Sequence, residues 1–177
     1  YGELDEQKVV VVVEARPERV QRTIEVAQLG VFYTCQLAAQ QMLRQAEGGR
    51  AGGKILIIGS VQAEFTPSAS AAYSMSKAAI NHFGGILALE LAPYHINVNT
   101  INPGWIDTPG ERELFGDAAV AGGAGRVPWG RLGTPLDIGE MAAFLASDAA
   151  DYVTGASIRV DGGFVLGLRP AGDLPKD

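Results

Sequence analysis

A tyrosine and a lysine four residues apart, Tyr73 and Lys77, are the pair of side chains in this sequence best suited to proton transfer. If their segment is helical, one turn of helix brings both side chains onto the same face. A positive charge beside a phenol favours the phenolate and lowers the phenol pKa toward the range useful for acid/base work. The same spacing also occurs on ordinary solvated helix faces, so the surrounding elements must decide between the two interpretations.

Short runs of apolar and β-branched residues predict four buried strands. They are residues 9–13, 54–58, 96–101 and 157–160. The first is a bare run of valines, which suits a strand that helices cover on both faces.

Apolar periodicity and helix-boundary residues predict the helices between these strands. We expect helices at about 17–45, 71–92 and 134–147, with one further short helical candidate at 111–115. Thr134 and Pro135 form a helix start, with a hydroxyl N-cap followed by proline in the first turn. The rest of the segment 105–133 is rich in glycine, and so long a connection is usually a lid or a binding loop.

Alternation of strand and helix predicts an α/β fold with a parallel sheet and right-handed crossovers. Ligands of such sheets bind beyond the carboxyl ends of the strands. Ser60 and the pair Pro103 and Gly104 come directly after strands, and Tyr73 begins the helix that follows one of them. We therefore expect these residues to meet at one edge of the sheet.

Composition excludes several kinds of partner. The chain carries a formal charge of −6 without a cluster of basic residues, which argues against nucleic acid and against an anionic membrane surface.

Cys35 is the only cysteine and there are two histidines, so an internal disulfide is excluded and a metal site is not expected. Cys35 lies in an apolar stripe and is expected to be buried. No run approaches the roughly 18 apolar residues of a membrane span, and we expect a cytoplasmic protein.

The chain resembles the second half of a short-chain dehydrogenase/reductase. Ser60, Tyr73 thirteen residues later, and then Lys77 match that family's Ser…Tyr-x-x-x-Lys motif in order and spacing. Residues 99–108 resemble its Pro-Gly…Thr segment, and residues 131–135 and 153–163 resemble its C-terminal signatures. Together these stretches cover about residues 29–164.

The resemblance implies a partial Rossmann-like, doubly wound parallel sheet, formed by the last four strands of the family's sheet with helices on both faces. It implies one truncated domain over residues 1–177, in which 1–16 lead into the sheet, 17–164 form the catalytic portion and 165–177 are a loose tail.

The resemblance also implies roles for individual residues. Tyr73 would be the general acid/base, Lys77 would assist it and hold the nicotinamide ribose, and Ser60 would bind the substrate oxygen. NAD or NADP would be the cofactor, with Pro103, Gly104, Ile106 and Thr108 at its nicotinamide end. Gln62 and Trp105 would line the substrate side, where a small carbonyl or alcohol would bind.

Departures from the family pattern concern the cofactor. No Gly-x-x-x-Gly-x-Gly stretch, which would cradle the pyrophosphate, occurs in these 177 residues. Alignment of residues 26–30 with the family's Val-Asn-x-x-Gly places Ala27 where an asparagine usually completes a proton relay, and Gln28 is a poor substitute.

Two functions therefore compete. The first is an NAD(P)-dependent oxidoreductase that interconverts a carbonyl and an alcohol and is impaired in this chain alone. The second is a non-catalytic, self-associating module, whose exposed sheet edge pairs with another chain. The resemblance also implies a homo-oligomer, a dimer or tetramer. The apolar residues of the helices that begin at Pro17 and Ala71 are either its interface, as the resemblance implies, or part of the core.

Overall fold

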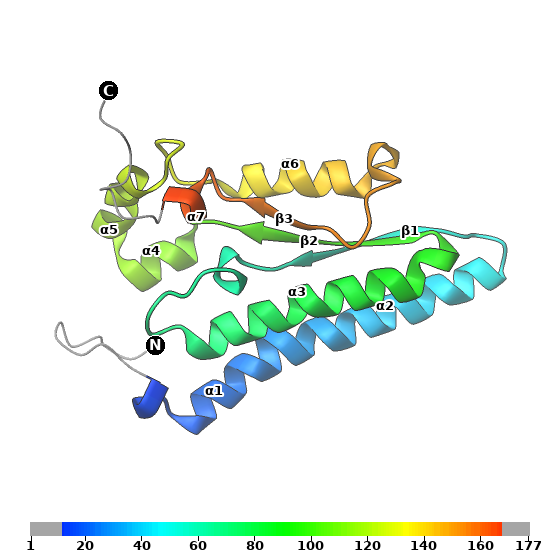
Figure 1. The fold of residues 1–177 in the computed structure, drawn as a ribbon, viewed down its shortest axis with the longest axis horizontal. Coiled ribbons are helices and arrows are strands. Elements are labelled where there is room, and N and C mark those ends of the chain that lie inside the picture. Colours follow the sequence, from blue (N-terminus) through cyan, green and yellow to red (C-terminus); the bar gives the residue numbers. More distant parts are fainter. Residues whose placement is uncertain (1–11, 168–177) are drawn as a thin grey trace.

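Three parallel strands form the sheet in the computed structural model, which describes residues 12–167. They are β1 (Gly53–Ile58), β2 (Ile96–Pro103) and β3 (Ser157–Val160), and their order in the sheet is β1-β2-β3. Each agrees with a predicted strand to within two residues. In Figure 1 the arrowheads of the strands point toward the end of the sheet where α4, α5 and α7 gather.

The remaining predicted strand, the valine run at residues 9–13, is not a strand where the structure describes it. Val12–Glu14 is a single 3-10 turn, Val12 is 71% exposed, and residues 9–11 lie outside the described part of the chain. The turn is closed by a hydrogen bond from Ala15 N to Val12 O (3.1 Å), just before Pro17 begins a helix. Arg16, between this turn and the helix, is extended (φ −76°, ψ 124°), so the chain has turned before it reaches Pro17.

Long helices cover one face of the sheet. α1 (Pro17–Ile24), a π-helical stretch (Glu25–Leu29) and α2 (Gly30–Glu47) form one continuous helical run, where the sequence predicted a single helix at 17–45. α3 (Ala71–Leu91) lies beside it and ends in the 3-10 turn Ala92–Tyr94. On the opposite face lies α6 (Pro135–Ala146), whose start carries the predicted cap as a complete capping box.

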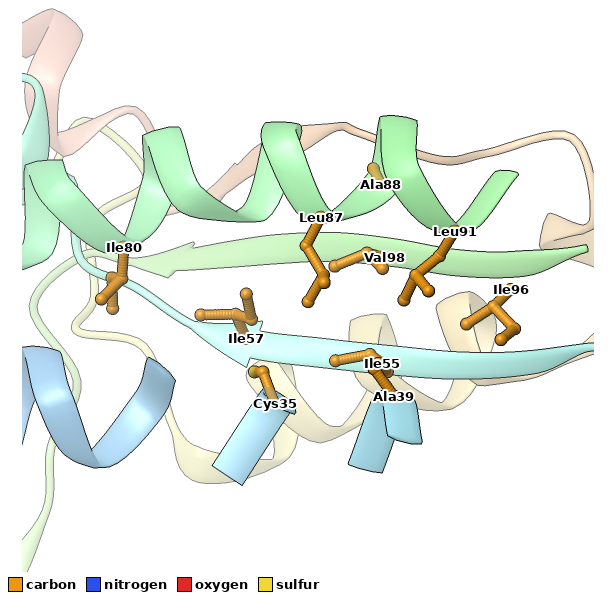
Figure 2. Close-up of a cluster of buried hydrophobic side chains, with 10 residues drawn as sticks. All are labelled: Cys35, Ala39, Ile55, Ile57, Ile80, Leu87, Ala88, Leu91, Ile96 and Val98. Carbon is orange, nitrogen blue, oxygen red and sulfur yellow. The ribbon is translucent and has the colours of Figure 1, made fainter. Parts of the chain in front are cut away.

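The main core lies between the sheet and the α2–α3 layer. Figure 2 shows its buried side chains pointing toward one another from four elements. The cluster contains Cys35, Ala39, Ile55, Ile57, Ile80, Leu87, Ala88, Leu91, Ile96 and Val98. Cys35 is therefore a core residue, as predicted, and burial raises the pKa of its thiol. On the other face, Ile101 of β2 packs with Leu145 of α6 in a separate cluster.

The two crossovers of this sheet have opposite hands, so the expectation that both are right-handed is wrong. Both connections step across the sheet in the same direction, because the strand order is β1-β2-β3. However, α3 packs on the face of Ile96 and Val98, whereas α6 packs on the face of Ile101. Helices on opposite faces cannot give the same hand for the same step. The connection between β2 and β3 is long enough to carry α6 to the face of the sheet opposite α3.

The glycine-rich connection contains more helix than predicted. The short candidate at 111–115 is part of α4 (Pro109–Phe115), which is followed by α5 (Asp117–Gly122) and the 3-10 turn Gly123–Arg126. After β3, the short helix α7 (Phe164–Gly167) buries Phe164 against Val61 and Val127. Val165, the first residue of the predicted tail, is partly buried against the same cluster, and residues 168–177 lie outside the described part.

Candidate active site

Ser60 stands two residues beyond the end of β1, at the start of the 3-10 turn Val61–Ala63. Its backbone is extended (φ −166°, ψ 149°), and its Oγ accepts a hydrogen bond from the N–H of Gln62 at 3.2 Å. The side chain therefore caps the turn while its own hydroxyl hydrogen stays available for another acceptor. Ser60 is 8% exposed, so its direction is set by neighbours rather than by solvent.

Tyr73 and Lys77 lie one turn apart near the start of α3, as the spacing predicts. The Lys77 Nζ is 5.4 Å from the centroid of the Tyr73 ring and donates a hydrogen bond to the main-chain carbonyl of Ile58 at 2.9 Å. Both side chains are half-buried. Since Ile58 ends β1 two residues before Ser60, this bond holds the cation at the carboxyl end of the strand beside the serine loop.

Burial changes the titration of the lysine. Removal of water from the Lys77 ammonium lowers the pKa of Lys77 below its ordinary value of 10.5. The ammonium thus retains less hydration than a surface lysine and interacts more strongly with groups placed next to it.

Gln62 connects the serine loop to the tyrosine helix. Its Oε1 accepts hydrogen bonds from the hydroxyls of Ser70 and Ser74, the second at 3.4 Å. Ser70 precedes α3 and Ser74 lies next to Tyr73 in the chain. These bonds, with that of Lys77 to Ile58, bring Ser60, Gln62, Tyr73 and Lys77 into one group.

Pro103 ends β2 at the same edge of the sheet, and Gly104 follows it. The N–H of Gly104 donates to Val160 O at 3.0 Å. A Cβ at Gly104 would lie 2.6 Å from Asp161 Cα, so only glycine allows this close approach to the end of β3.

Ile106 and Thr108 lie further along the loop. Ile106 forms an isolated parallel bridge with Gly133. Its two hydrogen bonds run from Asp107 N to Gly133 O (2.8 Å) and from Gly133 N to Trp105 O (3.0 Å). The N–H of Ile106 takes no part in the bridge. Thr108 is the N-cap of α4 and accepts from Glu111 N at 3.2 Å. Trp105 packs in the apolar cluster with Val61 and Phe164, directly beside the serine turn.

Charged groups surround this loop. Hydrogen bonds from Arg112 lower the pKa of Asp107, with Nε–Oδ1 and Nη2–Oδ2 distances of 2.7 and 2.6 Å. Burial raises the pKa of Glu111. The start of the loop after β2 is thus held by the ion pair of Asp107 and Arg112.

Within residues 12–167, no set of three or more His, Cys, Asp or Glu side chains is placed to hold a metal ion. Over the same residues, no helix is both long and apolar enough to cross a bilayer.

The family model described as enoyl-(acyl carrier protein) reductase matches residues 6–165. A crystal structure of a short-chain type dehydrogenase/reductase from Mycobacterium marinum superposes with a TM-score of 0.80 at 33% identity, over 92% of this chain and 61% of that one. The chain belongs to the short-chain dehydrogenase/reductase family.

Other members of the short-chain dehydrogenase/reductase family are similar over the same region. An L-rhamnose-1-dehydrogenase of Scheffersomyces stipitis is 38% identical over 157 residues, which are 88% of this chain and 59% of that protein. A putative 2-deoxy-d-gluconate 3-dehydrogenase from Agrobacterium tumefaciens, solved with bound NADP, gives a TM-score of 0.81 at 34% identity, over 90% of this chain and 63% of that one. The chain thus spans less than two thirds of the length of these short-chain dehydrogenases/reductases.

The segment aligned with the family's relay asparagine is not regular α-helix. Ala27 and Gln28 lie in the π-helical stretch Glu25–Leu29, which packs against α3, and Gln28 lines a small hollow with Ala79 and Ile80. A π-helical turn shifts the side chains that follow it, and such turns are frequent at functional sites.

Sequence reasoning missed two asparagines at this edge. The amide of Asn102 in β2 bonds to the backbone of Ser60. Asn81, one turn after Lys77, buries an Oδ1 that has no hydrogen-bond partner among the described residues. Asn102 is one of several polar residues in β2, with Asn97, Asn99 and Thr100, and nothing in the local sequence sets it apart from them.

Proposed function

We propose that this short-chain dehydrogenase/reductase is an NAD(P)-dependent oxidoreductase that interconverts a small carbonyl compound and its alcohol. One observation carries the proposal. The ammonium of Lys77 lies 5.4 Å from the Tyr73 ring, on one helix face, next to the loop of Ser60 at the carboxyl end of the sheet. A phenol, an ammonium and a hydroxyl in this arrangement suit proton transfer to or from an oxygen.

The residues at this edge fit the nicotinamide end of a dinucleotide. The Lys77 ammonium, the Thr108 hydroxyl and the Ile106 amide, which the bridge to Gly133 leaves unused, are hydrogen-bond donors that suit ribose hydroxyls and a carboxamide. When bound, the nicotinamide supplies or accepts the hydride. The NADP-bound neighbour supports a cofactor of this class, and the choice between NAD and NADP is left open in the proposal.

The protein's own part in the reaction is orientation and proton transfer. Tyr73 would donate a proton to the carbonyl oxygen in reduction and remove it from the hydroxyl in oxidation. Ser60 would hydrogen-bond the same oxygen through the hydrogen that its capping bond leaves available. Lys77, held by Ile58, would keep a positive charge beside the phenol. Gln62 and Trp105 would border the substrate.

The test compares Tyr73→Phe and Ser60→Ala with the wild-type chain in an assay of nicotinamide absorbance, using a panel of small ketones and secondary alcohols. NADH, NADPH and their oxidised forms are supplied in the millimolar range, because this chain alone is expected to bind its cofactor weakly. Tyr94→Phe is the matched control, because Tyr94 lies in the 3-10 turn before β2, at the opposite end of the sheet. We expect Tyr73→Phe to lose about 10²- to 10⁴-fold in rate and the control to keep its rate. Equal rates for both tyrosine variants would refute the proposal.

A second function, self-association, is favoured by the exposed faces of the sheet and helices. In the described part of the chain, β1 pairs with β2 on one side only, and Ile58 at its end is 47% exposed. Leu37 on α2 and Leu89 on α3 are 64% and 77% exposed. Apolar surface of this kind suits contact with a second copy of the chain.

Sedimentation of the wild type and of Leu37→Glu and Leu89→Glu separates the two interfaces. If the helices form the contact, the glutamate variants shift toward the monomer. If the edge of β1 forms it, these variants stay associated. A monomeric wild type would exclude self-association at the concentrations tested.

A further inference from the structure

The side chain of Asn102 connects the loop of Ser60 to the last strand of the sheet. Asn102 lies near the end of β2 and is fully buried, with 0% exposure. Its Oδ1 accepts the hydrogen bond of the Ser60 N–H at 3.0 Å. Its Nδ2 donates to Ser157 Oγ at 2.9 Å and to Glu64 Oε1 at 3.2 Å. Both donor hydrogens and the acceptor of this amide are thus used.

The partners of Asn102 fix the orientation of its amide. The N–H of Ser60 can only donate, and the ionised carboxylate of Glu64 can only accept. Rotation of the amide by 180° would set an NH₂ group against the N–H and an oxygen against the carboxylate. Only one orientation satisfies both partners, so the side chain is a rigid link rather than an adaptable one.

The backbone around this link is equally constrained. The N–H of Gly59 donates to Ile101 O at 2.7 Å, and a Cβ at Gly59 would overlap the Asn102 amide oxygen. Beyond Glu64, the link continues to Arg159 of β3, with an Nε–Oε2 distance of 3.5 Å. Arg159 is also the register partner of Asn102 in the sheet. The position of the serine loop is therefore tied to both β2 and β3.

We propose that Asn102 is a positioning residue for Ser60, and that it sets the place of the Ser60 hydroxyl through the Ser60 backbone N–H. The proposal rests on the proposed function, in which that hydroxyl binds the substrate oxygen. Because Ser60 Oγ also caps the following turn, the direction of the main chain at Ser60 decides where the hydroxyl hydrogen can point. A displacement of about 1 Å at such a group costs on the order of 10²-fold in rate.

Asn97 provides the matched control. It lies on the same strand and is also buried. Its Nδ2 donates to Asp151 O and Val153 O (2.7 and 3.1 Å), and its Oδ1 accepts from Lys54 Nζ (2.8 Å). These partners lie at the opposite end of β2. Asn97→Ala should therefore reproduce the loss of stability of Asn102→Ala without touching the serine loop.

Two readouts on the full chain test the proposal: amide hydrogen exchange at Ser60, and kcat with KM. Asn102→Ala should speed exchange at Ser60 by about tenfold or more, because the N–H loses its partner. It should lower kcat about tenfold to 10²-fold while KM changes less than about twofold. Asn97→Ala should change neither. Equal exchange at Ser60 in both variants overturns the proposal, and so does a normal kcat in Asn102→Ala despite faster exchange.

A rescue experiment covers the case in which Asn102→Ala does not fold. Asn102→Asp places a second carboxylate against Glu64, whereas the pair Asn102→Asp and Glu64→Gln restores a donor opposite an acceptor. The single variant should show faster exchange at Ser60, and the pair should return it toward the wild type. No difference between single and pair overturns the proposal. If the wild type transfers no hydride even at cofactor concentrations in the millimolar range, the proposed function fails, and exchange at Ser60 alone decides whether Asn102 positions the loop.

Discussion

The ammonium of Lys77 is hydrogen-bonded to the main-chain carbonyl of Ile58, the last residue of β1, at 2.9 Å. A side chain of α3 thus donates a hydrogen bond to the last carbonyl of β1, and the same ammonium lies beside the Tyr73 ring. Because burial lowers the pKa of Lys77, the fold holds a charge where it is less well solvated than in the unfolded chain. This cost is expected of a group kept for function rather than for stability.

The first prediction concerns this cost and its pH dependence. The pKa of Lys77 is lower in the folded chain than in the unfolded chain, where it is 10.5. The free energy of unfolding of the wild type therefore rises as the pH increases from the folded pKa toward 10.5. Below the folded pKa, Lys77 is charged in both states and destabilises the folded chain by its full amount. Lys77→Met removes this dependence. The free energy of unfolding of the variant minus that of the wild type should be more positive at pH 7 than at pH 10, measured by urea denaturation. A difference that is constant with pH would show that Lys77 titrates as a solvated lysine.

The second prediction uses the neighbouring glycines of α3. A Cβ at Gly84 would lie 2.8 Å from Thr100 Oγ1 of β2, whereas a Cβ at Gly85 would have no atom within 4 Å. Gly84→Ala should therefore destabilise by about 1–3 kcal/mol through overpacking. Gly85→Ala should stabilise by up to about 1 kcal/mol, because alanine favours the helix. Thermal unfolding measures both, and an equal effect of the two would contradict the close packing of α3 on β2.

The third prediction concerns Cys35. This thiol is 6% exposed in the main core, and burial raises its pKa, so little thiolate is present at neutral pH. We expect a thiol reagent to react with the folded chain far more slowly than with the chain in denaturant. Cys35→Ala should destabilise the protein, since it removes packing against Ile55 and Ile57. Rapid labelling without denaturant would show that this part of the core opens readily.

The fourth prediction concerns the start of α6. Thr134 Oγ1 accepts from Asp137 N, and Asp137 Oδ2 accepts from Thr134 N at 2.7 Å. Thr134→Ala should cost about 1 kcal/mol of stability, and the exposed neighbour Leu136→Ala should cost much less.

Hydrogen bonds from Arg131 and then Thr134 hold the pKa of Asp137 well below 3.8. The stability that Asp137 contributes is thus present above pH 3.8 and is lost as the pH falls below it. Asp137→Asn should lack this loss in acid denaturation curves.

The fifth prediction concerns the cofactor. The 177 residues contain no Gly-x-x-x-Gly-x-Gly turn, and the described donors fit only the nicotinamide end. We therefore expect this polypeptide by itself to bind NADH and NADPH weakly or not at all. A fluorescence titration with both cofactors measures this, and a Kd in the micromolar range would contradict it.

The sequence predicted the elements whose pattern is local. The strands at β1, β2 and β3 and the cap at Thr134 follow from short-range patterns, and the structure confirms them. The motif spacing also predicted that Ser60, Tyr73 and Lys77 meet at one sheet edge, and contacts of Gln62 and Ile58 bring them together. Their roles in chemistry remain proposals.

Features that depend on distant partners were not predictable. The valine run at 9–13 has the composition of a strand, yet Val12–Glu14 is a 3-10 turn. The π-helical stretch at Glu25–Leu29 leaves no mark in the apolar stripe. The role of Asn102 depends on Ser60, which lies 42 residues away in the chain. Similarly, the opposite hands of the crossovers depend on which face α6 covers.

The buried amides of β2 also carry information about assembly of the sheet. Asn97 and Asn99 face the loop before β3, with Asn99 Nδ2 bonded to Val153 O at 2.8 Å, whereas Asn102 faces the serine loop. An apolar strand tolerates a shift along its neighbours if the side chains are of similar size. Here a slip by one residue would turn all three amides to the wrong face and leave them without partners, at a cost of roughly 1–3 kcal/mol each. Errors of pairing by one residue during folding are therefore opposed by buried polar groups as well as by the apolar side chains of the central strand.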